Sequence, residues 1–288
     1  MQSTSHPKND TGYAIRMKRA IIAGIDSGLG SMIASHLAAK GWEIVGTTRR
    51  TGLDSEKYQQ NFIISKCDFS NSQSIDTCVS EILIMNKDWH VLVLAIGVLA
   101  PIGEFTSTNY EQWKNSFDVN FLGQMHFIQK LLRNSPDNSS KLVLTFAGGG
   151  TNGPTLNFSS YTLAKIALIK AMELLASEIP DTKFVSLGTG WMNTPIHTQT
   201  LEAGSSAGDI YFDTLERVEM NNFGKSADLL NFVDWAISAD KEITSGRNFS
   251  LQGDPWSGQQ LSEELKNDTN MFKLRRFRNY DGLKGANE

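Results

Sequence analysis

Residues 18–41 constrain the fold of this chain more than any other stretch of its sequence. Ala20–Ala23 is an apolar run that is long enough for a buried strand and too short for a helix. Glycines then follow at a G-x3-G-x-G spacing, and apolar residues recur at every fourth position (Gly24, Gly28 and Gly30; Leu29, Ile33 and Leu37). The second repeat places one apolar stripe on a helix, which Gly41 ends as a C-cap residue. A strand, a glycine turn and an amphipathic helix form the first half of a βαβ unit.

The glycine turn predicts a site for the pyrophosphate of a dinucleotide cofactor. Glycines let the backbone approach a phosphate closely, and the free N–H groups at the start of the helix bind it. We therefore assign the turn residues to cofactor binding: Gly24, Ser27, Gly28, Leu29 and Gly30. The alternative is a flexible turn without a ligand, but the flanking strand and helix favour the cofactor interpretation.

Composition excludes several other classes of protein. The chain has 288 residues, 27 basic and 31 acidic side chains and a net charge of −4, so no nucleic-acid surface is expected. Cys67 and Cys78 are too few for a disulfide framework and indicate a reducing setting. Residues 1–17 are expected to be a polar leader rather than a signal peptide. No run approaches the roughly 18 apolar residues of a membrane span, so we expect a soluble, cytoplasmic protein.

Short apolar runs alternate with helical patterns along most of the chain. The runs are 20–23, 43–48, 62–66, 91–95, 142–146, 183–187 and 248–251, and one long helix is expected over 110–132. This alternation predicts an α/β fold, a Rossmann-type doubly wound parallel sheet of about seven strands with helices on both faces, in three layers.

No linker divides the chain, so residues 18–254 are expected to be one cofactor-binding catalytic domain. Residues 188–222 have weak periodicity and are either a substrate lid or a surface excursion. Residues 255–288 are expected to be a polar tail with one basic cluster (Lys273, Arg275, Arg276 and Arg278). The cluster is expected to be solvated, and the alternative is a contact with an anion or another subunit. No residues are assigned to a metal site.

The end of the second predicted strand indicates which nicotinamide cofactor is bound. Thr48 stands where an Asp or Glu would accept bonds from the ribose 2′-OH of NAD, and two arginines follow. Arg49 can pair with a 2′-phosphate, so NADP(H) is expected in preference to NAD(H). The alternative is that Arg49 and Arg50 are solvated loop charges. Asp68 either accepts from the adenine amino group or caps the next helix, and Gly97 leaves room for a cofactor ribose.

Tyr161 and Lys165 are the candidate catalytic pair. They stand four residues apart, so they share one face of a predicted helix. A tyrosine titrates near pH ~10, and a neighbouring ammonium group is expected to lower that pKa toward neutrality. Asn120 lies inside the long predicted helix, where asparagine is unfavourable. It is either a surface residue or the site of a kink that frees a carbonyl for water.

With these motifs, residues 18–254 resemble the short-chain dehydrogenase/reductase family, in its smaller single-domain branch. The resemblance rests on the glycine turn, Asp68, Asp118-Val-Asn120-Phe-Leu-Gly, Tyr161-Thr-Leu-Ala-Lys165 and 243–254 as the final strand region. It implies hydride transfer between nicotinamide and a carbonyl or alcohol carbon. Tyr161 would be the proton donor or acceptor, Lys165 its activator and ribose ligand, and Asn120 the anchor of a water relay. Thr194 matches the family's threonine that binds the carboxamide of the nicotinamide. Because members of this family are usually dimers or tetramers, the resemblance also implies a homodimer or homotetramer.

Three positions depart from the family pattern. Leu94-Ala95-Ile96-Gly97 replaces Asn-Asn-Ala-Gly, and Thr189-Gly190 replaces Pro-Gly. Ala147 and Gly148 stand where the carbonyl-polarising serine is expected. Losing such a donor typically costs about 10²- to 10³-fold in rate. Thr145, Thr151 or Ser159 replaces it, or a hydroxyl of the substrate does, or catalysis is slow or absent.

Taken together, these features predict an NADP(H)-dependent oxidoreductase acting on a small polar carbonyl or alcohol, with Tyr161 as general acid and base. The alternative is an NADP-binding sensor or scaffold whose catalysis is weakened by the missing serine. A sugar-nucleotide epimerase or dehydratase of the same family is disfavoured, because the chain after Gly253 is too short for a separate substrate domain.

Overall fold

The computed structural model describes residues 18–50, 62–85, 88–135, 141–148 and 150–276. The expected leader (1–17), the end of the expected tail (277–288) and Gly149 lie outside the described residues. None of the helices in these ranges is long and apolar enough to cross a bilayer.

The described residues form a seven-stranded parallel sheet in the order β3-β2-β1-β4-β5-β6-β7. The strands are β1 (Arg19–Ala23), β2 (Glu43–Thr48), β3 (Phe62–Lys66), β4 (Val91–Leu94), β5 (Lys141–Phe146), β6 (Thr182–Gly188) and β7 (Arg247–Ser250). Each overlaps one of the predicted apolar runs. The chain reverses its direction of travel across the sheet between β1 and β4, which is where ligands bind in this type of fold.

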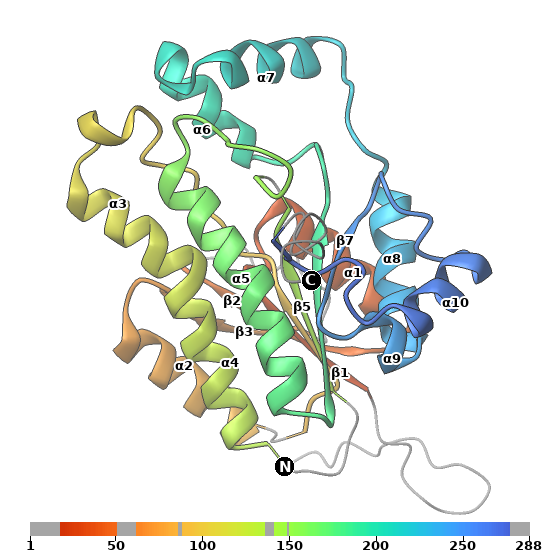
Figure 1. Cartoon of the computed structure of the whole chain (residues 1–288). Helices are drawn as coiled ribbons and strands as arrows, with labels where there is room; N and C mark the ends of the chain where they lie inside the picture. Colours follow the sequence, from red (N-terminus) through yellow and green to blue (C-terminus); the bar gives the residue numbers. More distant parts are fainter. Residues whose placement is uncertain (1–17, 51–61, 86–87, 136–140, 149, 277–288) are drawn as a thin grey trace, which may run out of the picture.

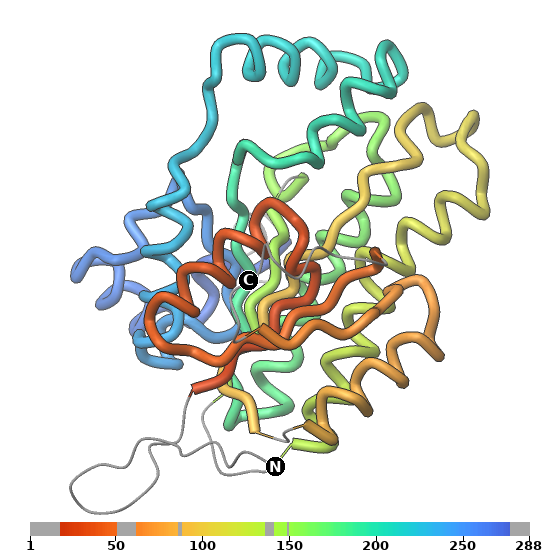
Figure 2. Tube along the Cα trace, turned by 180° about the vertical axis from the view of Figure 1, so that it is seen from behind, coloured from red at the N-terminus to blue at the C-terminus, as the bar shows by residue number. Residues whose placement is uncertain are grey.

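Both faces of the sheet are buried, which explains why its strands are continuous apolar runs. Along β1, Ala20 and Ile22 enter one core, whereas Ile21 and Ala23 enter the other, as the two-residue repeat of a strand requires. The first core is completed by α1 (Gly28–Ala39) and α8 (Ser226–Ser238), and the second by α2 (Ser72–Met85), α4 (Gly123–Arg133) and α5 (Ser159–Glu178). Figures 1 and 2 show these two helical layers on opposite faces, so the predicted three-layer fold is confirmed.

The helix expected over 110–132 is interrupted in its middle. It consists of α3 (Tyr110–Phe117), a π-helical turn η3 (Asp118–Leu122) and α4. Such a turn inserts one extra residue into the helix and frequently marks a functional site.

The segment expected as a substrate lid or a surface excursion is largely helical. Residues 188–222 contain α6 (Ile196–Ala203), a 3-10 turn η4 (Gly204–Ala207) and α7 (Asp209–Glu219). Both helices lie beyond the carboxyl ends of the strands, at the top of Figure 1. Short elements also flank the main helices: η2 (Phe105–Ser107), α9 (Lys241–Thr244) and α10 (Gln259–Asn267).

The segment expected as a polar tail packs against the domain as far as residue 276. Leu261 and Leu265 of α10 are buried in the core that also contains α8. The guanidinium group of buried Arg247, the first residue of β7, donates to the carbonyl oxygens of Leu265, Asp268 and Met271. These bonds hold the segment against the start of β7. A polar helix with two apolar residues on one face gave too weak a signal for this packing to be predicted.

Candidate active site

The glycine turn after β1 is closed by bonds within itself. Ser27 is the N-cap of α1, its Oγ accepts from Gly30 N at 3.0 Å, and its N–H donates to Gly24 O at 3.0 Å. Gly24 has φ +77°, and a Cβ on Gly30 would lie only 2.1 Å from Gly24 O. The turn therefore brings the backbone to the start of α1 in the form that an anionic pyrophosphate needs. The side chain of Leu29 packs against the core, so only its backbone is left for the predicted contact with a cofactor.

Thr194 lies beside this turn although it follows β6 in the chain. A Cβ on Gly28 would be 2.7 Å from Thr194 Cγ2, so the two residues are in close contact. The structure thus brings together the predicted pyrophosphate turn and the predicted carboxamide ligand. It also explains why position 28 is glycine.

The two arginines after β2 have different surroundings. Both arginines are exposed, but among the described residues only Arg50 forms an ion pair, from its Nε to Asp26 Oδ2 of the glycine turn at 3.3 Å. Thr48 is buried, and its Oγ1 accepts from Arg50 N at 3.1 Å. Arg50 thus balances the carboxylate of Asp26 and leaves Arg49 as the candidate for a 2′-phosphate.

Asp68 closes a turn rather than capping α2. Its Oδ1 accepts from the backbone N and the Oγ of Ser70, at 2.9 and 2.7 Å. The cap of α2 is Asn71, whose Oδ1 accepts from Ser74 N at 3.0 Å. The predicted capping role therefore belongs to Asn71, and a bond from Asp68 to an adenine remains a prediction.

Asn120 is completely buried in the π-helical turn, so the surface alternative is wrong. Its Nδ2 donates to Val98 O and Ser116 O at 2.8 and 2.9 Å, and its Oδ1 accepts from Val98 N at 3.1 Å. These bonds offset the unfavourable free energy of an asparagine inside a helix, and they connect η3 to the loop after β4. Asn120 lies at an interruption of the helix, as the second alternative expected, but the interruption is a π-helical turn. The carbonyl oxygen of Asn120 is not left for water alone, because it accepts from Gln124 Nε2 at 3.0 Å.

Gln124 is a residue of this site that sequence reasoning missed. It is fully buried, and its Nε2 also donates to Ile96 O at 3.4 Å, the same oxygen that accepts from Lys165 Nζ at 3.3 Å. The only signal in the sequence is an amide four residues after Asn120, in a helix whose inner face is otherwise apolar.

Lys165, Asn120 and Gly97 converge at the end of β4. A Cβ on Gly97 would lie 3.6 Å from Asn120 Oδ1 and 3.9 Å from Lys165 Nζ. Lys165 is buried on α5, and burial lowers its pKa to about 8, so that it still carries a positive charge at neutral pH. The structure therefore assembles three of the predicted site residues around one small space.

Tyr161 lies on the same face of α5 as Lys165, as predicted. Lys165 Nζ is 5.5 Å from the centroid of its ring. The predicted lowering of the phenol pKa is not found: burial among apolar side chains raises the pKa of Tyr161 to about 12. Tyr161 therefore keeps its proton at neutral pH and is suited to donate it.

The residues around the missing serine explain its absence. A Cβ on Gly148 would lie 2.7 Å from Gly188 Cα, so a serine there requires a shift of the backbone. Ala147 is buried against α5. Of the three proposed substitutes, Ser159 Oγ accepts from Trp113 Nε1 at 2.9 Å, Thr145 is buried beside Gln124, and Thr151 is exposed. None of these contacts joins a substitute hydroxyl to Tyr161.

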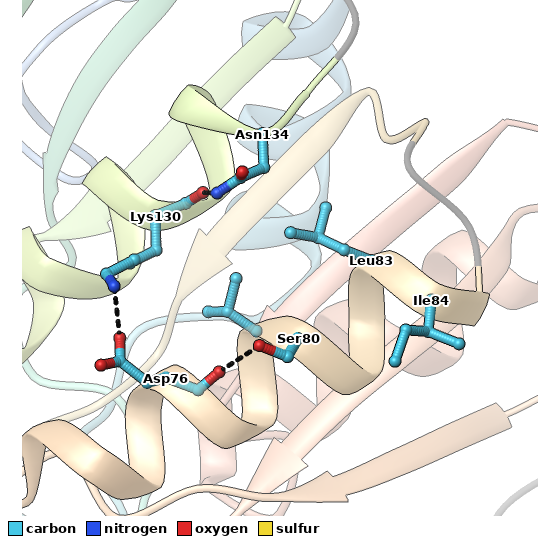
Figure 3. A pocket seen from close by; sticks show the side chains of 7 residues that line it. Asp76, Ser80, Leu83, Ile84, Lys130 and Asn134 are labelled. Atoms are coloured by element: carbon cyan, nitrogen blue, oxygen red, sulfur yellow. Dashed lines mark hydrogen bonds and ion pairs between the residues drawn. The ribbon is translucent and has the colours of Figure 1, made fainter.

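Two hollows lie away from these residues. One, of about 410 Å³, lies between α2 and α4, and an ion pair of 2.9 Å between Asp76 and Lys130 crosses it (Figure 3). The other, of about 600 Å³, lies between Glu173 on α5 and the α9 region. Neither is lined by a predicted site residue.

Comparisons with known proteins find relatives along most of the chain. A family model described as enoyl-(acyl carrier protein) reductase matches residues 23–253. NADPH-dependent pterin aldehyde reductase of Arabidopsis thaliana is 24% identical over 248 residues, covering 81% of this chain and 92% of that protein. NADPH-dependent 3-dehydrocapnine reductase of Ornithobacterium rhinotracheale is 26% identical over 211 residues, with coverages of 69% and 72%.

Solved structures show the same fold. A short-chain dehydrogenase/reductase from Saccharomyces cerevisiae has a TM-score of 0.74 at 19% identity, covering 85% of this chain and 98% of that chain. An actinorhodin polyketide ketoreductase variant with NADPH has a TM-score of 0.70 at 17% identity, with coverages of 81% and 95%. Because the family model spans most of the sequence and the motifs meet in one site, this chain belongs to the short-chain dehydrogenase/reductase family of oxidoreductases.

Proposed function

We propose that this protein is an NADP(H)-dependent carbonyl reductase with Tyr161 as its general acid. The observation that carries the proposal is the meeting of Lys165, Asn120 and Gly97 beside Tyr161, at the carboxyl edge of the sheet and next to the glycine turn. When bound, the nicotinamide supplies the hydride that reduces the carbonyl carbon.

The chain's own residues supply the proton and the electrostatic support. Tyr161 keeps its proton until the substrate oxygen gains negative charge, and then donates it, which completes the alcohol. Lys165 carries a positive charge close to the phenol ring and so favours the phenolate that is left behind. Asn120 and Gln124 hold the loop after β4, whose carbonyl oxygen at Ile96 accepts from Lys165.

The residues around the turn fit a dinucleotide with a 2′-phosphate. The close contacts at Gly28 and Gly30 leave backbone N–H groups as the lining of the turn, and exposed Arg49 follows β2. The NADPH dependence that the two named relatives carry supports the same preference. The sensor or scaffold alternative is not favoured, because those relatives are reductases. NADPH binding without oxidation across a broad panel of aldehydes and ketones, followed at the nicotinamide absorbance, would favour it.

The Arg49→Ala variant is expected to bind NADPH about tenfold more weakly, because one charge-assisted contact to the 2′-phosphate is lost. Its affinity for NADH should stay within about twofold of the wild type, since NADH has no 2′-phosphate. Fluorescence titration with both cofactors measures this. The control is Arg133→Ala, which removes an exposed arginine at the end of α4. Equal weakening of NADPH and NADH by Arg49→Ala would contradict the assignment.

The Gln124→Leu variant is expected to lower kcat about tenfold while NADPH affinity changes less than twofold. The carbonyl oxygens of Asn120 and Ile96 each lose a donor, and leaving the buried Asn120 oxygen without this partner typically costs about 1–3 kcal/mol. The expected loss appears in kcat because Ile96 O also holds Lys165. Gln112→Leu, at an exposed position of α3, is the matched control. Unchanged kcat in a folded Gln124→Leu protein would show that Gln124 serves stability alone.

A further inference from the structure

The side chains around Tyr161 are apolar. Tyr161 packs in one cluster with residues of the loop after β4, with the residue that precedes α5, and with residues of α6, η4 and α7: Leu99, Ile102, Phe158, Ile196, Ala203, Ala207, Ile210 and Tyr211. Besides these apolar contacts, the positively charged Lys165 Nζ lies 5.5 Å from the centroid of the phenol ring. A substrate whose carbonyl reaches the Tyr161 hydroxyl must therefore lie against an apolar wall.

The α6–α7 segment closes this wall over Tyr161. Gln199 of α6 accepts from Leu99 N at 2.9 Å and from Ala100 N at 3.3 Å, which ties α6 to the loop after β4. The base of the segment is held by a parallel bridge between Met192 and Gly224. Figures 1 and 2 both show α6 and α7 extending beyond the carboxyl edge of the sheet. Part of residues 188–222 therefore packs beside Tyr161, a position that is compatible with the lid interpretation.

Apolar side chains continue from this cluster to the surface. Phe105, Leu156 and Phe212 are 68%, 71% and 65% exposed. The three segments that carry them meet at Asn157: Gly103 N donates to Asn157 O at 2.8 Å, and a Cβ on Gly208 would lie 3.0 Å from Asn157 Nδ2. Three large exposed apolar residues within a few positions of one junction form an apolar rim, which we define as Phe105, Leu156 and Phe212. Gathered exposed apolar surface of this kind marks a binding site.

From this arrangement we propose that the substrate carries its carbonyl on an apolar body, an alkyl chain or hydrophobic ring system that extends from Tyr161 to the apolar rim. The proposal rests on the proposed function in one respect, since Tyr161 marks the reacting end. It replaces the small polar substrate expected from the sequence. The physical reason is that a polar body would lose its hydration against this wall without gaining hydrogen bonds, whereas an apolar body gains from leaving water.

Binding of a homologous series tests the proposal without relying on turnover. Methyl ketones from butanone to decanone are titrated by calorimetry into the full-length protein with saturating NADP+, which cannot reduce them, and again without cofactor. The dissociation constant should fall about threefold to fourfold for each added methylene, because each buried CH₂ contributes about 0.8 kcal/mol. Reduction with NADPH should show the same trend in kcat/KM.

Variants of the apolar rim test whether the alkyl chain of a bound ketone reaches that rim. Leu156→Ser and Phe212→Ser should weaken binding of the longest ketones about fivefold or more and leave butanone unchanged, since only a long chain reaches the apolar rim. Both positions are exposed, so the fold should tolerate the change. Ile84→Ser, at an 84% exposed position on α2, is the matched control and should change nothing.

The outcomes separate the two proposals. Affinity that is independent of chain length, or rim variants that bind every ketone like the wild type, would overturn the apolar substrate even if the protein reduces ketones. Affinity that rises with chain length and depends on the rim, without any reduction by NADPH, would support the apolar site and contradict the proposed reaction.

Discussion

The Tyr161→Phe variant is expected to lose about 10²- to 10⁴-fold in kcat for carbonyl reduction, the usual contribution of a positioned general acid. The phenol of Tyr161 lies on the face of α5 shared with Lys165, and its hydroxyl is the proposed proton donor. Phenylalanine keeps the ring and its apolar contacts, so NADPH affinity and thermal stability should stay close to the wild type. Single-turnover measurement of NADPH oxidation, with a ketone from the series above, reads the chemical step directly.

A matched variant and a pH profile complete this experiment. Tyr110→Phe removes a phenol that is 69% exposed at the start of α3, and it should leave kcat unchanged. In the wild type, the rate of reduction should decline as pH rises through about 8, because Lys165 loses its proton and the charge that favours the phenolate. Full turnover by Tyr161→Phe would exclude Tyr161 as the acid, and with it the proposed mechanism.

The Gly30→Ala variant is expected to weaken NADPH binding by at least about tenfold and to lower the free energy of unfolding by about 1–3 kcal/mol. Its Cβ would lie 2.1 Å from Gly24 O, a backbone atom that also accepts from Ser27 N. The turn must open to make room, which displaces the N–H groups at the start of α1. Thermal unfolding with and without NADPH measures both effects, because a bound ligand stabilises the folded protein by an amount that grows with the logarithm of its affinity at a fixed ligand concentration.

Gly153→Ala is the control for the glycine experiment. Nothing lies within 4 Å of a Cβ at that position, so neither Tm nor NADPH affinity should change. A Gly30→Ala protein with wild-type affinity for NADPH would show that the cofactor does not depend on this turn. That result would leave the fold intact and remove the assignment of the turn residues to the pyrophosphate.

Absence of the usual serine has a structural consequence for the reaction. Because Gly148 packs directly on Gly188, the backbone between β5 and β6 is closer than a side chain at position 148 allows. In the proposed reaction, Tyr161 and Lys165 would therefore have to stabilise the charge on the carbonyl oxygen without this donor. Reduction without that donor is expected to be slower by about 10²- to 10³-fold than in a site that has one.

The sequence by itself determined the fold and the local pairing of the chemical groups. Apolar runs of strand length alternating with helices led to the parallel sheet, and the glycine spacing placed the turn at the start of α1. The four-residue spacing put Tyr161 and Lys165 on one face of α5. These features depend on periodicity and on short-range backbone geometry, which neighbouring residues encode.

Only the tertiary structure decided how distant segments meet and what surrounds each group. It placed Thr194 against Gly28, showed that Arg50 pairs with Asp26, and revealed Gln124 beneath Lys165 through Ile96 O. The pKa of Tyr161 is raised, where the sequence predicted a lowered value, because hydration is lost to side chains from loops and helices far along the chain. Desolvation and contact across the sheet depend on the complete packing, and no local pattern of residues contains that information.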